Sequence, residues 1–559
     1  MNEYIVTCKT HEDLQNLYDD METPGGSLYI PNRSVDLVHR RAISRNTHYM
    51  LTEEEAVEIR KDERVIACER SPRERGITPE YFWTQTGDFE KTESTFQSDD
   101  KNWGLYRLIK GDTVSNWGSD STTGISNKTI NTTASGKNVD VVIVDGHVNP
   151  NHPEFAVNPD GTGGSRVNQF NWFQYKDDLG YGSHPSTYTY STSGASPNTN
   201  HGSHVAGTAC GNTQGWARDA NIYNMAFSDS LSGVTDWDLY LWDYLRHFHK
   251  NKPINSATGR RNPTITNHSW GYNYNSLFVA GVTAYSYRSA SMTDISSMST
   301  ADKVVELETN GGTPVYFQPA NQMLKPPARE ASVDADLQDA INDGVIIISS
   351  AGNSLWNCDT PSGDDYNNSH TYFGQTSPHS RGSTPGSADN VICVGNIGSK
   401  VGEYKSFSSN WGGRVDIWAP GTDIISAVYD SSSATTEGGY TPLTADPRDS
   451  SYHLASISGT SMASPQICGI IACLAEQEPN LTQAEALQHL IENSLPEVGS
   501  NGSPTQSPYE GFGDSLNRYA FIPKKRPDSG MTSPAQIHKN RNTTTAGVKY
   551  PRVRYQTTS

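Results

Sequence analysis

The middle of the chain alternates short apolar runs with polar loops and helical segments. The runs are VDVVIVD (139–145), ANIYNMAF (220–227), TITNHSW (264–270), GVIIISSAGN (344–353), NVICVGNI (390–397) and VDIWAPG (415–421). Near-continuous apolar runs are typical of strands buried on both faces, as in a parallel sheet covered by helices. The pattern predicts an α/β domain built on a doubly wound, mainly parallel sheet flanked by helices.

The first 71 residues have a different pattern, in which strands alternate with helices over short distances. The strand-like stretches are EYIVTCK, NTHYML and ERVIACER, and the helical stretches are HEDLQNLYDDM and TEEEAVEIRKD. Thr52 is the expected N-cap of the second helix, with Glu55 three residues later as the partner in a capping box. We therefore expect a small α+β domain at 1–71.

The remaining stretches are set apart by composition. Residues 72–101 lack a clear period and are rich in charge, Thr and Ser, so we interpret them as a linker. The α/β domain extends over 102–522 and carries two polar segments, about 273–332 and 429–452, which we interpret as insertions. The end of the chain, 523–559, is basic and almost without apolar periodicity, which predicts a disordered tail; a partner-binding arm is the alternative.

Charge and cysteine content exclude several classes of protein. The net charge of −19 argues against a general nucleic-acid binder, because phosphate binding depends on Lys and Arg. No segment has the ~18 consecutive apolar residues of a membrane span, so we expect no membrane anchor. The 7 cysteines are odd in number and lack paired spacing. Reduced, buried thiols are the expectation, with a disulfide or a metal site as the alternative.

Residues with catalytic potential lie next to these apolar runs. Asp145 ends the first run, and Asn353 ends the GVIIISSAGN run. His201 and His204 lie three apart at an expected helix start. Ser461 lies where SISGTSMASPQ becomes an apolar helix, near unpaired N–H groups and the positive end of the helix dipole. Because sites in open α/β sheets lie beyond the carboxyl ends of the strands, these residues are candidates for one site.

Their order, Asp, His, Asn, Ser, closely resembles that of the subtilisin family of serine proteases. The matching stretches are VVIVDGHVNPNHPEF, NHGSHVAGTACG, NHSWG, ISSAGN and SGTSMASPQICG, with NWGLYRL and FSSNWGGRVDIWAPG as further framework matches. The resemblance covers about 102–522. It implies a subtilisin-like fold and a serine endopeptidase that hydrolyses polypeptide substrates through an acyl-enzyme.

The resemblance also assigns roles. Ser461 is the implied nucleophile, His201 the base that takes its proton, and Asp145 the group that orients His201. Asn353 and the Ser461 N–H are the implied donors to the oxyanion. His204 matches a helix position without a catalytic role.

Substrate binding is implied for two segments. Ser269, Trp270 and Gly271 match the segment that pairs with an extended substrate by strand addition. Ala351 and Gly352 match a wall of the pocket for the residue before the scissile bond. Trp270 either restricts this pocket or has a structural role.

No cofactor is implied for catalysis, but a structural calcium ion is. Asp416 matches a cation ligand of the family, with the carbonyls of Asp389 and Val391 as co-ligands. A capped loop without a metal ion is the alternative.

The sequence departs from the family directly after Asp145, where Gly146 and His147 replace the usual Thr or Ser followed by Gly. The imidazole of His147 either perturbs the electrostatics of the triad or faces solvent. Ser203 and Ser464 replace usual threonines and keep the hydroxyl group.

The N-terminal unit, which ends in ERVIACERSP, resembles the inhibitory propeptide of the family, a small ferredoxin-like domain. This implies a zymogen that cuts itself within 72–101 and carries its own N-terminal domain as an intramolecular inhibitor; an uncleaved regulatory domain is the alternative. The start of the chain, MNEYIVTCKTHEDLQNLYDDM, lacks the apolar stretch of a signal peptide. We therefore expect a cytoplasmic or virion-associated location.

Two other functions remain open at this point. One is a catalytically inactive relative that keeps the fold as a binding or assembly module. The other is a peptide ligase, in which an amine rather than water captures the acyl-enzyme.

Overall fold

The chain forms two compact units, Met1–Tyr81 and Phe82–Ser559. The computed structural model describes residues 1–30, 37–39, 45–70, 83–87, 103–109, 128–132, 134–190, 199–226, 234, 237–274, 277–314, 323–398, 404–429, 442–495, 515 and 518–521. The expected basic tail at 523–559 lies outside these residues, and the predicted domain boundaries stay predictions.

The first unit has the order β1 α1 β2 β3 α2 β4. Its elements are β1 (Asn2–Cys8), α1 (His11–Glu22), β2 (Leu37–His39), β3 (Asn46–Leu51), α2 (Glu53–Arg60) and β4 (Val65–Arg70). The strands pair antiparallel in the order β2-β3-β1-β4. This is the ferredoxin-like arrangement of a split βαβ unit, so the predicted α+β fold is confirmed.

Local sequence explains both the helix starts and the buried face of this unit. Thr52 and Glu55 form the predicted capping box, in which the Thr52 N–H donates to Glu55 Oε2 at 2.8 Å and the Glu55 N–H donates to Thr52 Oγ1 at 3.3 Å. Tyr4, Val6 and Cys8 alternate with more exposed residues along β1 and are fully buried. The period of two places one face of the sheet against the helices.

Part of the predicted linker is a strand. β5 (Trp83–Gly87) pairs antiparallel with β6 (Lys128–Thr132), so residues 83–87 join the second unit. A two-stranded ribbon is held by hydrogen bonds to its partner strand and does not need a buried apolar face. Its sequence therefore need not alternate between apolar and polar residues. For this reason the stretch shows no period in the sequence.

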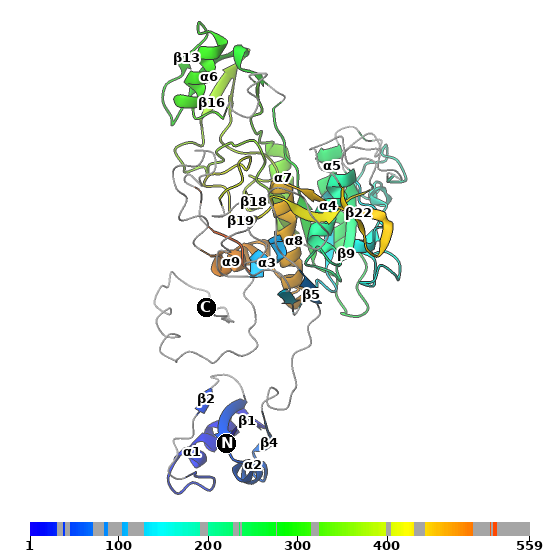
Figure 1. The fold of residues 1–559 in the computed structure, drawn as a ribbon, viewed down its shortest axis with the longest axis vertical. Coiled ribbons are helices and arrows are strands. Elements are labelled where there is room, and N and C mark those ends of the chain that lie inside the picture. The colour runs from blue at the N-terminus through cyan, green and yellow to red at the C-terminus, as the bar shows by residue number, and fades with distance from the viewer. Residues whose placement is uncertain are drawn as a thin grey trace. The chain divides into compact units, whose positions relative to one another are not determined.

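The second unit is built on a seven-stranded sheet in the order β19-β18-β15-β10-β7-β9-β8, of which Figure 1 labels β9, β18 and β19. Every described pair in this sheet is parallel. Its strands are β7 (Asp140–Asp145), β8 (Val167–Asn168), β9 (Asn221–Ala226), β10 (Thr264–His268), β15 (Ile346–Ser350), β18 (Ile392–Ile397) and β19 (Ile417–Pro420). All six predicted apolar runs are strands of this sheet; the short strand β8 was not predicted.

Helices cover both faces of the sheet. Along β7, Val141 and Ile143 belong to one buried cluster, and Val142 and Val144 belong to another. The first cluster includes α3 (Trp103–Ile109), α4 (Thr199–Cys210), α8 (Thr460–Gln477) and α9 (Gln483–Asn493), and the second includes α5 (Trp237–Asn251) and α7 (Ala331–Asn342). The predicted doubly wound α/β fold is therefore confirmed.

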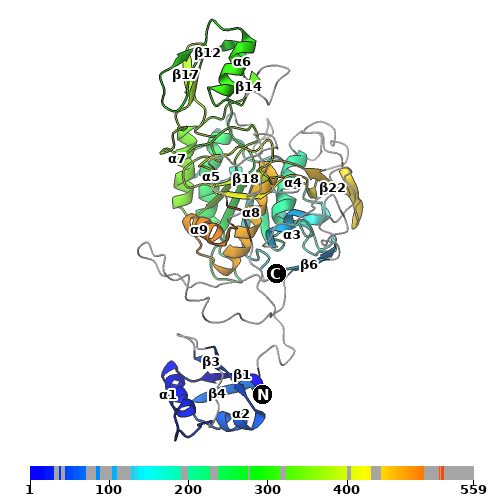
Figure 2. The same cartoon turned by 60° about the vertical axis from the view of Figure 1, so that its left-hand side comes forward.

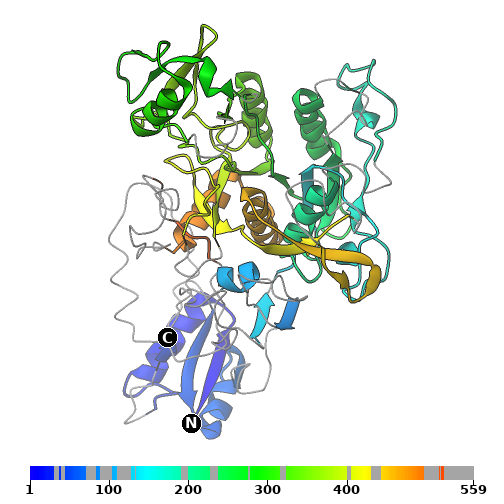
Figure 3. The ribbon, with the colours of Figure 1, turned by 45° about the horizontal axis from the view of Figure 1, so that its top comes forward.

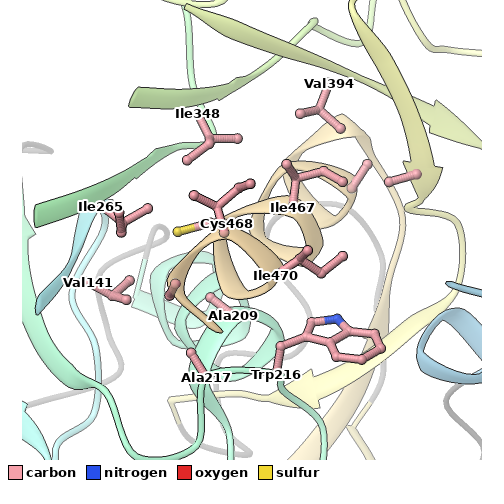
Figure 4. Packing of buried hydrophobic residues seen from close by; sticks show 14 of the residues in the cluster. Val141, Ala209, Trp216, Ala217, Ile265, Ile348, Val394, Ile467, Cys468 and Ile470 are labelled. Atoms are coloured by element: carbon pink, nitrogen blue, oxygen red, sulfur yellow. The ribbon is translucent and has the colours of Figure 1, made fainter. Parts of the chain in front are cut away.

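Helix α8 runs through the centre of the first cluster. Figure 4 shows its residues Ile467, Cys468 and Ile470 surrounded by side chains from strands of the sheet and from α4. A helix that is apolar on all sides belongs in the interior of a protein. The residues at its start are consequently held by packing on every side.

Most described elements of the predicted insertion at 273–332, from β11 to β14, belong to a small lobe of the second unit (Figure 2). The lobe contains β11 (Leu277–Phe278), η3 (Val279–Gly281), β12 (Val282–Ser286), β13 (Thr293–Asp294), α6 (Thr300–Thr309), β14 (Met323–Leu324), β16 (Ser369–Tyr372) and β17 (Gln375–Pro378). It has its own apolar cluster, which includes Val279, Leu307 and Trp356. Its strands β16 and β17 come from a later part of the chain, which was not predicted to be part of an insertion.

The second predicted insertion is partly described as a hairpin. β21 (Pro442–Asp446) and β22 (Asp449–Ile457) form a three-stranded sheet with β20 (Ile424–Ala427), and β22 leads directly to the start of α8 (Figure 3). Two 3-10 helices, Pro153–Phe155 and Trp172–Tyr175, lie in the loops after β7 and β8. Among the helices that the structure describes, none has the length and apolar character needed to cross a membrane.

Candidate active site

The candidate residues lie at the carboxyl ends of strands near the middle of the sheet. Asp145 ends β7, and Ser269 follows β10, its neighbour in the sheet. Strands β8 and β9 lie on one side of β7, and the later strands β10, β15, β18 and β19 lie on the other side. The direction in which the chain adds strands to the sheet therefore reverses at β7. Such a switch point is where open α/β sheets bind ligands.

Asp145 and His201 form a hydrogen bond from different elements. His201 lies in the first turn of α4, and its Nδ1 is 2.7 Å from Asp145 Oδ1. The same oxygen accepts from the Gly146 N–H at 2.7 Å. The side chain of Asp145 is 3% exposed and that of His201 is 31% exposed. The carboxylate is thus shielded from water, while the imidazole is partly exposed to solvent.

The unusual Gly146-His147 pair fits closely against α4. A Cβ atom on Gly202 would lie 2.5 Å from the Gly146 carbonyl oxygen, so glycine is needed there for this approach. Ser203 Oγ accepts from the Asn149 N–H at 3.1 Å. His147 is 2% exposed, and its ring meets the ring of Tyr190 edge to face at 6.0 Å. The alternative in which His147 faces solvent is therefore wrong.

His204 is turned away from this pair. Its Nε2 lies 2.8 Å from the Ile424 carbonyl oxygen and 3.1 Å from that of Ala455, which ties α4 to the β20–β22 sheet. Burial lowers the pKa of His204 to about 3, so the ring is neutral at ordinary pH. These contacts are structural.

Ser461 lies in the first turn of α8 and close to the end of β10. Its hydroxyl group donates to the Ser269 carbonyl oxygen at 3.1 Å. The residue is 7% exposed. The nearby N-terminus of α8 supplies N–H groups that have no partner within the helix.

Asn353 lies next to this helix start and is oriented by Thr460. Its Oδ1 accepts from the Thr460 N–H at 2.8 Å and from the Thr460 hydroxyl at 2.9 Å. The Nδ2 group of the same side chain is not used in these two bonds. Within the described ranges, neither Asn353 Nδ2 nor the Ser461 N–H donates to a protein acceptor. Two donors without a protein acceptor among the described residues therefore lie near the start of α8, one on Asn353 and one on Ser461. The sequence indicated Asn353 but not the orienting role of Thr460.

Within the described part of the chain, the main chain after β10 pairs with neighbouring main chain along one edge only. The Tyr272 N–H donates to the Thr384 carbonyl at 2.9 Å, and the Tyr272 carbonyl accepts from the Ala328 N–H at 3.0 Å. Ser269 and Gly271 lie three residues and one residue before Tyr272. Because successive residues of an extended segment face opposite edges, their main-chain groups are directed to the other edge. Trp270 packs among aromatic rings, with its ring 5.9 Å from that of His268 and 5.8 Å from that of Tyr272.

Ala351 and Gly352, the predicted wall of the substrate pocket, can present only main-chain atoms to a substrate. Ala351 is 1% exposed and belongs to the first apolar cluster, so its side chain faces the core. Its carbonyl oxygen accepts from Asn410 Nδ2 at 2.8 Å. Gly352 has φ +99°, and a Cβ atom there would lie 2.5 Å from Asn410 Nδ2, so only glycine fits. The backbone at 351–352 is therefore fixed by Asn410.

The predicted calcium ligands are used by an arginine. Arg414 Nη1 donates to Asp416 Oδ2 at 2.8 Å, and Arg414 Nη2 donates to the Val391 carbonyl oxygen at 2.6 Å. Asp416 Oδ2 also accepts from the Cys393 N–H at 2.8 Å. Two of the expected ligands thus already bind a buried cation, and the site does not fit calcium. The third expected ligand was the carbonyl of Asp389, a residue whose carboxylate lies 3.8 Å from Arg329 Nη2.

The missed signal was Arg414 itself, two residues before Asp416 in GGRVDIWAPG. A guanidinium group presents a planar fork of donors that matches carboxylate and carbonyl oxygens. Among the described residues, no cluster of three or more His, Cys, Asp or Glu side chains has metal-binding geometry.

Arg414→Ala is expected to make the stability of the protein depend on calcium. Removing the guanidinium leaves the Asp416 carboxylate, which is only 18% exposed, without its counter-ion. This costs about 3 kcal/mol and opens the oxygens to a metal ion. We expect the parent to melt at the same temperature in calcium and in EDTA, and the variant to melt lower in EDTA and to recover in calcium. Differential scanning fluorimetry measures both.

Lys250→Ala is the matched control, because Lys250 is 52% exposed and its partner Asp343 keeps a second cation, Arg246. It should melt within a few degrees of the parent in either buffer, since exposed ion pairs contribute ~1 kcal/mol or less. A parent that is itself destabilised by EDTA would contradict this account of the site.

Comparison with known proteins places these residues in one family. The sequence model of the subtilase family matches residues 136–513, which is more than half of the chain and includes Asp145, His201, Asn353 and Ser461. The chain belongs to the subtilase family. Its resemblance to subtilisin-like serine proteases, predicted from the motifs, is thereby confirmed.

Individual relatives of this subtilase match over shorter stretches. Subtilisin-like protease 10 of Arthroderma otae is 35% identical over 133 residues, which are 23% of this chain and 28% of that protein. Cerevisin of Saccharomyces cerevisiae is 29% identical over 163 residues, 26% of this chain and 22% of that protein. The chain thus spans about a quarter of the length of these curated relatives.

Solved structures match over more of the chain but with low identity. A cold-adapted subtilisin-like serine proteinase is 20% identical with a TM-score of 0.42, over 76% of this chain and 98% of that one. Sphericase is 19% identical with a TM-score of 0.40, over 76% and 99%.

The relatives correct the predicted location. The relatives that match this chain are fungal subtilisin-like proteases, among them cerevisin, and this similarity conflicts with a cytoplasmic or virion-associated location. The predicted cytoplasmic or virion-associated location is therefore wrong. It depended on the hydropathy of one short stretch at the start of the chain.

Proposed function

We propose that this subtilase is a serine endopeptidase in which Ser461, His201 and Asp145 form the catalytic triad. The observation that carries the proposal is the 2.7 Å hydrogen bond from His201 Nδ1 to the buried Asp145, at the sheet edge where the α8 start presents Ser461. A buried carboxylate on Nδ1 keeps that nitrogen protonated. Nε2 is then the basic nitrogen, which is the form that can take a proton from serine.

The reaction follows from these positions. The Ser461 Oγ attacks the carbonyl carbon of the substrate while His201 Nε2 takes its proton. The tetrahedral intermediate collapses when His201 gives the proton to the leaving amine, and an acyl-enzyme on Ser461 remains. Water then attacks the ester with His201 again as base, and the acid product leaves. Asp145 stays ionised and stabilises the imidazolium in both steps.

The unused donors near Ser461 favour charge stabilisation in this reaction. Asn353 Nδ2 and the Ser461 N–H would donate to the oxyanion as negative charge develops. Because Thr460 fixes the Asn353 side chain in advance, the site pays no cost of reorienting this donor during the reaction.

The edge after β10 that does not pair with the main chain of Ala328 and Thr384 supports binding of polypeptides. An extended substrate would add as a strand along Ser269 and Gly271, with hydrogen bonds to the main chain only. Such binding tolerates many side chains.

The N-terminal unit, with its ferredoxin-like fold, would act as an intramolecular inhibitor that is removed by self-cleavage.

The proposal is tested by incubating the full chain with denatured casein and counting new amino termini by mass spectrometry. We expect internal cleavage of the casein by the parent chain. A parent that releases no new termini, even after its own N-terminal unit has been removed, would contradict an endopeptidase.

Asn353→Leu is expected to lower kcat for a peptide substrate by about 10² to 10³, the effect known for the equivalent donor in subtilisin, with little change in KM. Leucine has nearly the same size but cannot donate to the oxyanion. Steady-state kinetics measure both constants. Asn342→Leu on the exposed end of α7 is the control and should match the parent. Equal kcat values for the two variants would exclude Asn353 from the oxyanion site.

A further inference from the structure

A chain of four hydrogen bonds connects the end of β10 to the start of α8. Ser464 Oγ donates to Asn267 Oδ1 at 2.7 Å, and Asn267 Nδ2 donates to Ser269 Oγ at 2.9 Å. Ser269 Oγ donates to the Ser461 carbonyl oxygen at 2.8 Å. The Ser461 hydroxyl donates back to the Ser269 carbonyl at 3.1 Å. We call the first three bonds the Asn267 relay.

The need for this relay follows from Pro465. In a regular helix the carbonyl of residue 461 accepts from the N–H of residue 465. Pro465 lies inside α8 and has no N–H, so the Ser461 carbonyl loses its helical partner. The Ser269 hydroxyl takes the place of that donor. The peptide unit of the nucleophile is therefore held by a side chain from the sheet rather than by its own helix.

Spacing along both elements brings the members of the relay together. Ser461 and Ser464 are three apart on a helix, and Asn267 and Ser269 are two apart on an extended segment, so each pair shares one face. Asn267 and Ser464 are fully buried, and Ser269 is 5% exposed. Each polar atom of the Asn267 carboxamide has one partner in the relay. Loss of any member leaves buried polar groups unsatisfied at the others.

We propose that Asn267 is a positioning residue for peptide hydrolysis, which sets the distance between the nucleophile Ser461 and the main chain that aligns the substrate. It joins the two segments that must be in register when substrate binds: the Ser269 main chain and the Ser461 peptide unit. This proposal rests on the proposed function of Ser461. Asn267 touches neither substrate nor reacting atoms, and it acts through Ser269.

The relay makes a prediction that a purely structural contact does not. A shift of the helix start by a fraction of an ångström displaces Ser461 from the attack position but leaves the Ser269 and Gly271 main chain available to substrate. The chemical step should therefore suffer and substrate binding should not. A misplacement of ~1 Å can cost about a hundredfold in rate.

The test uses full-length variants and three measurements: kcat and KM on a peptide substrate, the rate of reaction with a small fluorophosphonate, and the melting temperature. Asn267→Ala should lower kcat and the fluorophosphonate rate by about ten- to a hundredfold, with KM within twofold of the parent. Ser464→Ala should lower kcat in the same direction. Ser464→Thr keeps the hydroxyl group, so its kcat should stay close to that of the parent.

Asn396→Ala is the matched control, because Asn396 is a fully buried asparagine on β18 whose Oδ1 accepts from Thr422 rather than from a residue of the site. It should lose stability as Asn267→Ala does but keep kcat within twofold. If Asn267→Ala does not fold, the contrast between Ser464→Ala and Ser464→Thr decides the question.

The outcomes separate the relay from the proposed function. An active parent whose kcat is unchanged in Asn267→Ala and Ser464→Ala would overturn the relay alone. A loss of kcat in Asn396→Ala equal to that in Asn267→Ala would also overturn it, since stability would then explain both. A parent with neither peptide hydrolysis nor fluorophosphonate labelling would contradict the proposed function, and the relay with it.

Discussion

Ser461→Ala is expected to abolish peptide hydrolysis and to leave the full chain uncut. The variant removes the only atom that can form the acyl-enzyme in the proposed mechanism, and in subtilisin the loss of the nucleophile costs about 10⁶ in kcat. The parent chain should lose an N-terminal fragment containing β1–β4, while Ser461→Ala keeps its full mass. Intact-mass spectrometry after purification and the casein assay together measure both effects.

Ser458→Ala serves as the control for this experiment. Ser458 lies three residues earlier, and its Oγ accepts from the Asp423 N–H at 2.8 Å outside the triad. It should be cut and active like the parent. If Ser461→Ala lost the same fragment when expressed alone in a protease-deficient host, self-processing would be excluded and the N-terminal unit would be a regulatory domain removed by another enzyme.

Asp145→Asn is expected to lower kcat by about 10⁴ while the protein stays folded, as in the corresponding change in trypsin. The amide keeps the size of the carboxylate. However, its N–H₂ group stabilises the wrong tautomer of His201, and it cannot balance the imidazolium charge. Circular dichroism and steady-state kinetics on the variant after removal of the N-terminal unit give fold and rate separately.

Asp294→Asn, an exposed carboxylate in β13 of the small lobe, is the matched control and should leave kcat unchanged. A loss of less than tenfold in Asp145→Asn would mean that Asp145 does not orient the catalytic base. In that case the Gly146-His147 departure would mark a site with a different proton carrier.

The sheet was predictable because burial on both faces leaves a strong local signal. Six apolar runs gave six strands, and the capping box at Thr52 gave a helix start. β8 was missed because a strand of two residues has no period. The pairing of β5 with β6 and the joining of β16 and β17 to the first insertion depend on contacts across long stretches of sequence, which no local pattern contains.

The candidate site was predictable as far as it follows from strand ends and family motifs. The positions of Asp145, His201 and Ser461 are of this kind. The sequence did not predict that Arg414 binds the expected calcium ligands. Its guanidinium reaches Asp416 and the Val391 carbonyl only through the conformation of its side chain, which the sequence does not specify. The roles of Thr460 and Asn267 were also missed. Thr460 orients Asn353 and Asn267 orients Ser269 through hydrogen bonds between residues far apart in the sequence, which no local pattern reveals.

Labelling with a fluorophosphonate tests the central claim most directly, because the probe forms a covalent bond only with an activated serine. After digestion, tandem mass spectrometry locates the modified residue. The account predicts a single labelled site at Ser461 in the parent chain and almost no labelling in His201→Ala. A label on another serine, or a parent that hydrolyses casein without any labelled serine, would contradict the assignment of Ser461 as the nucleophile.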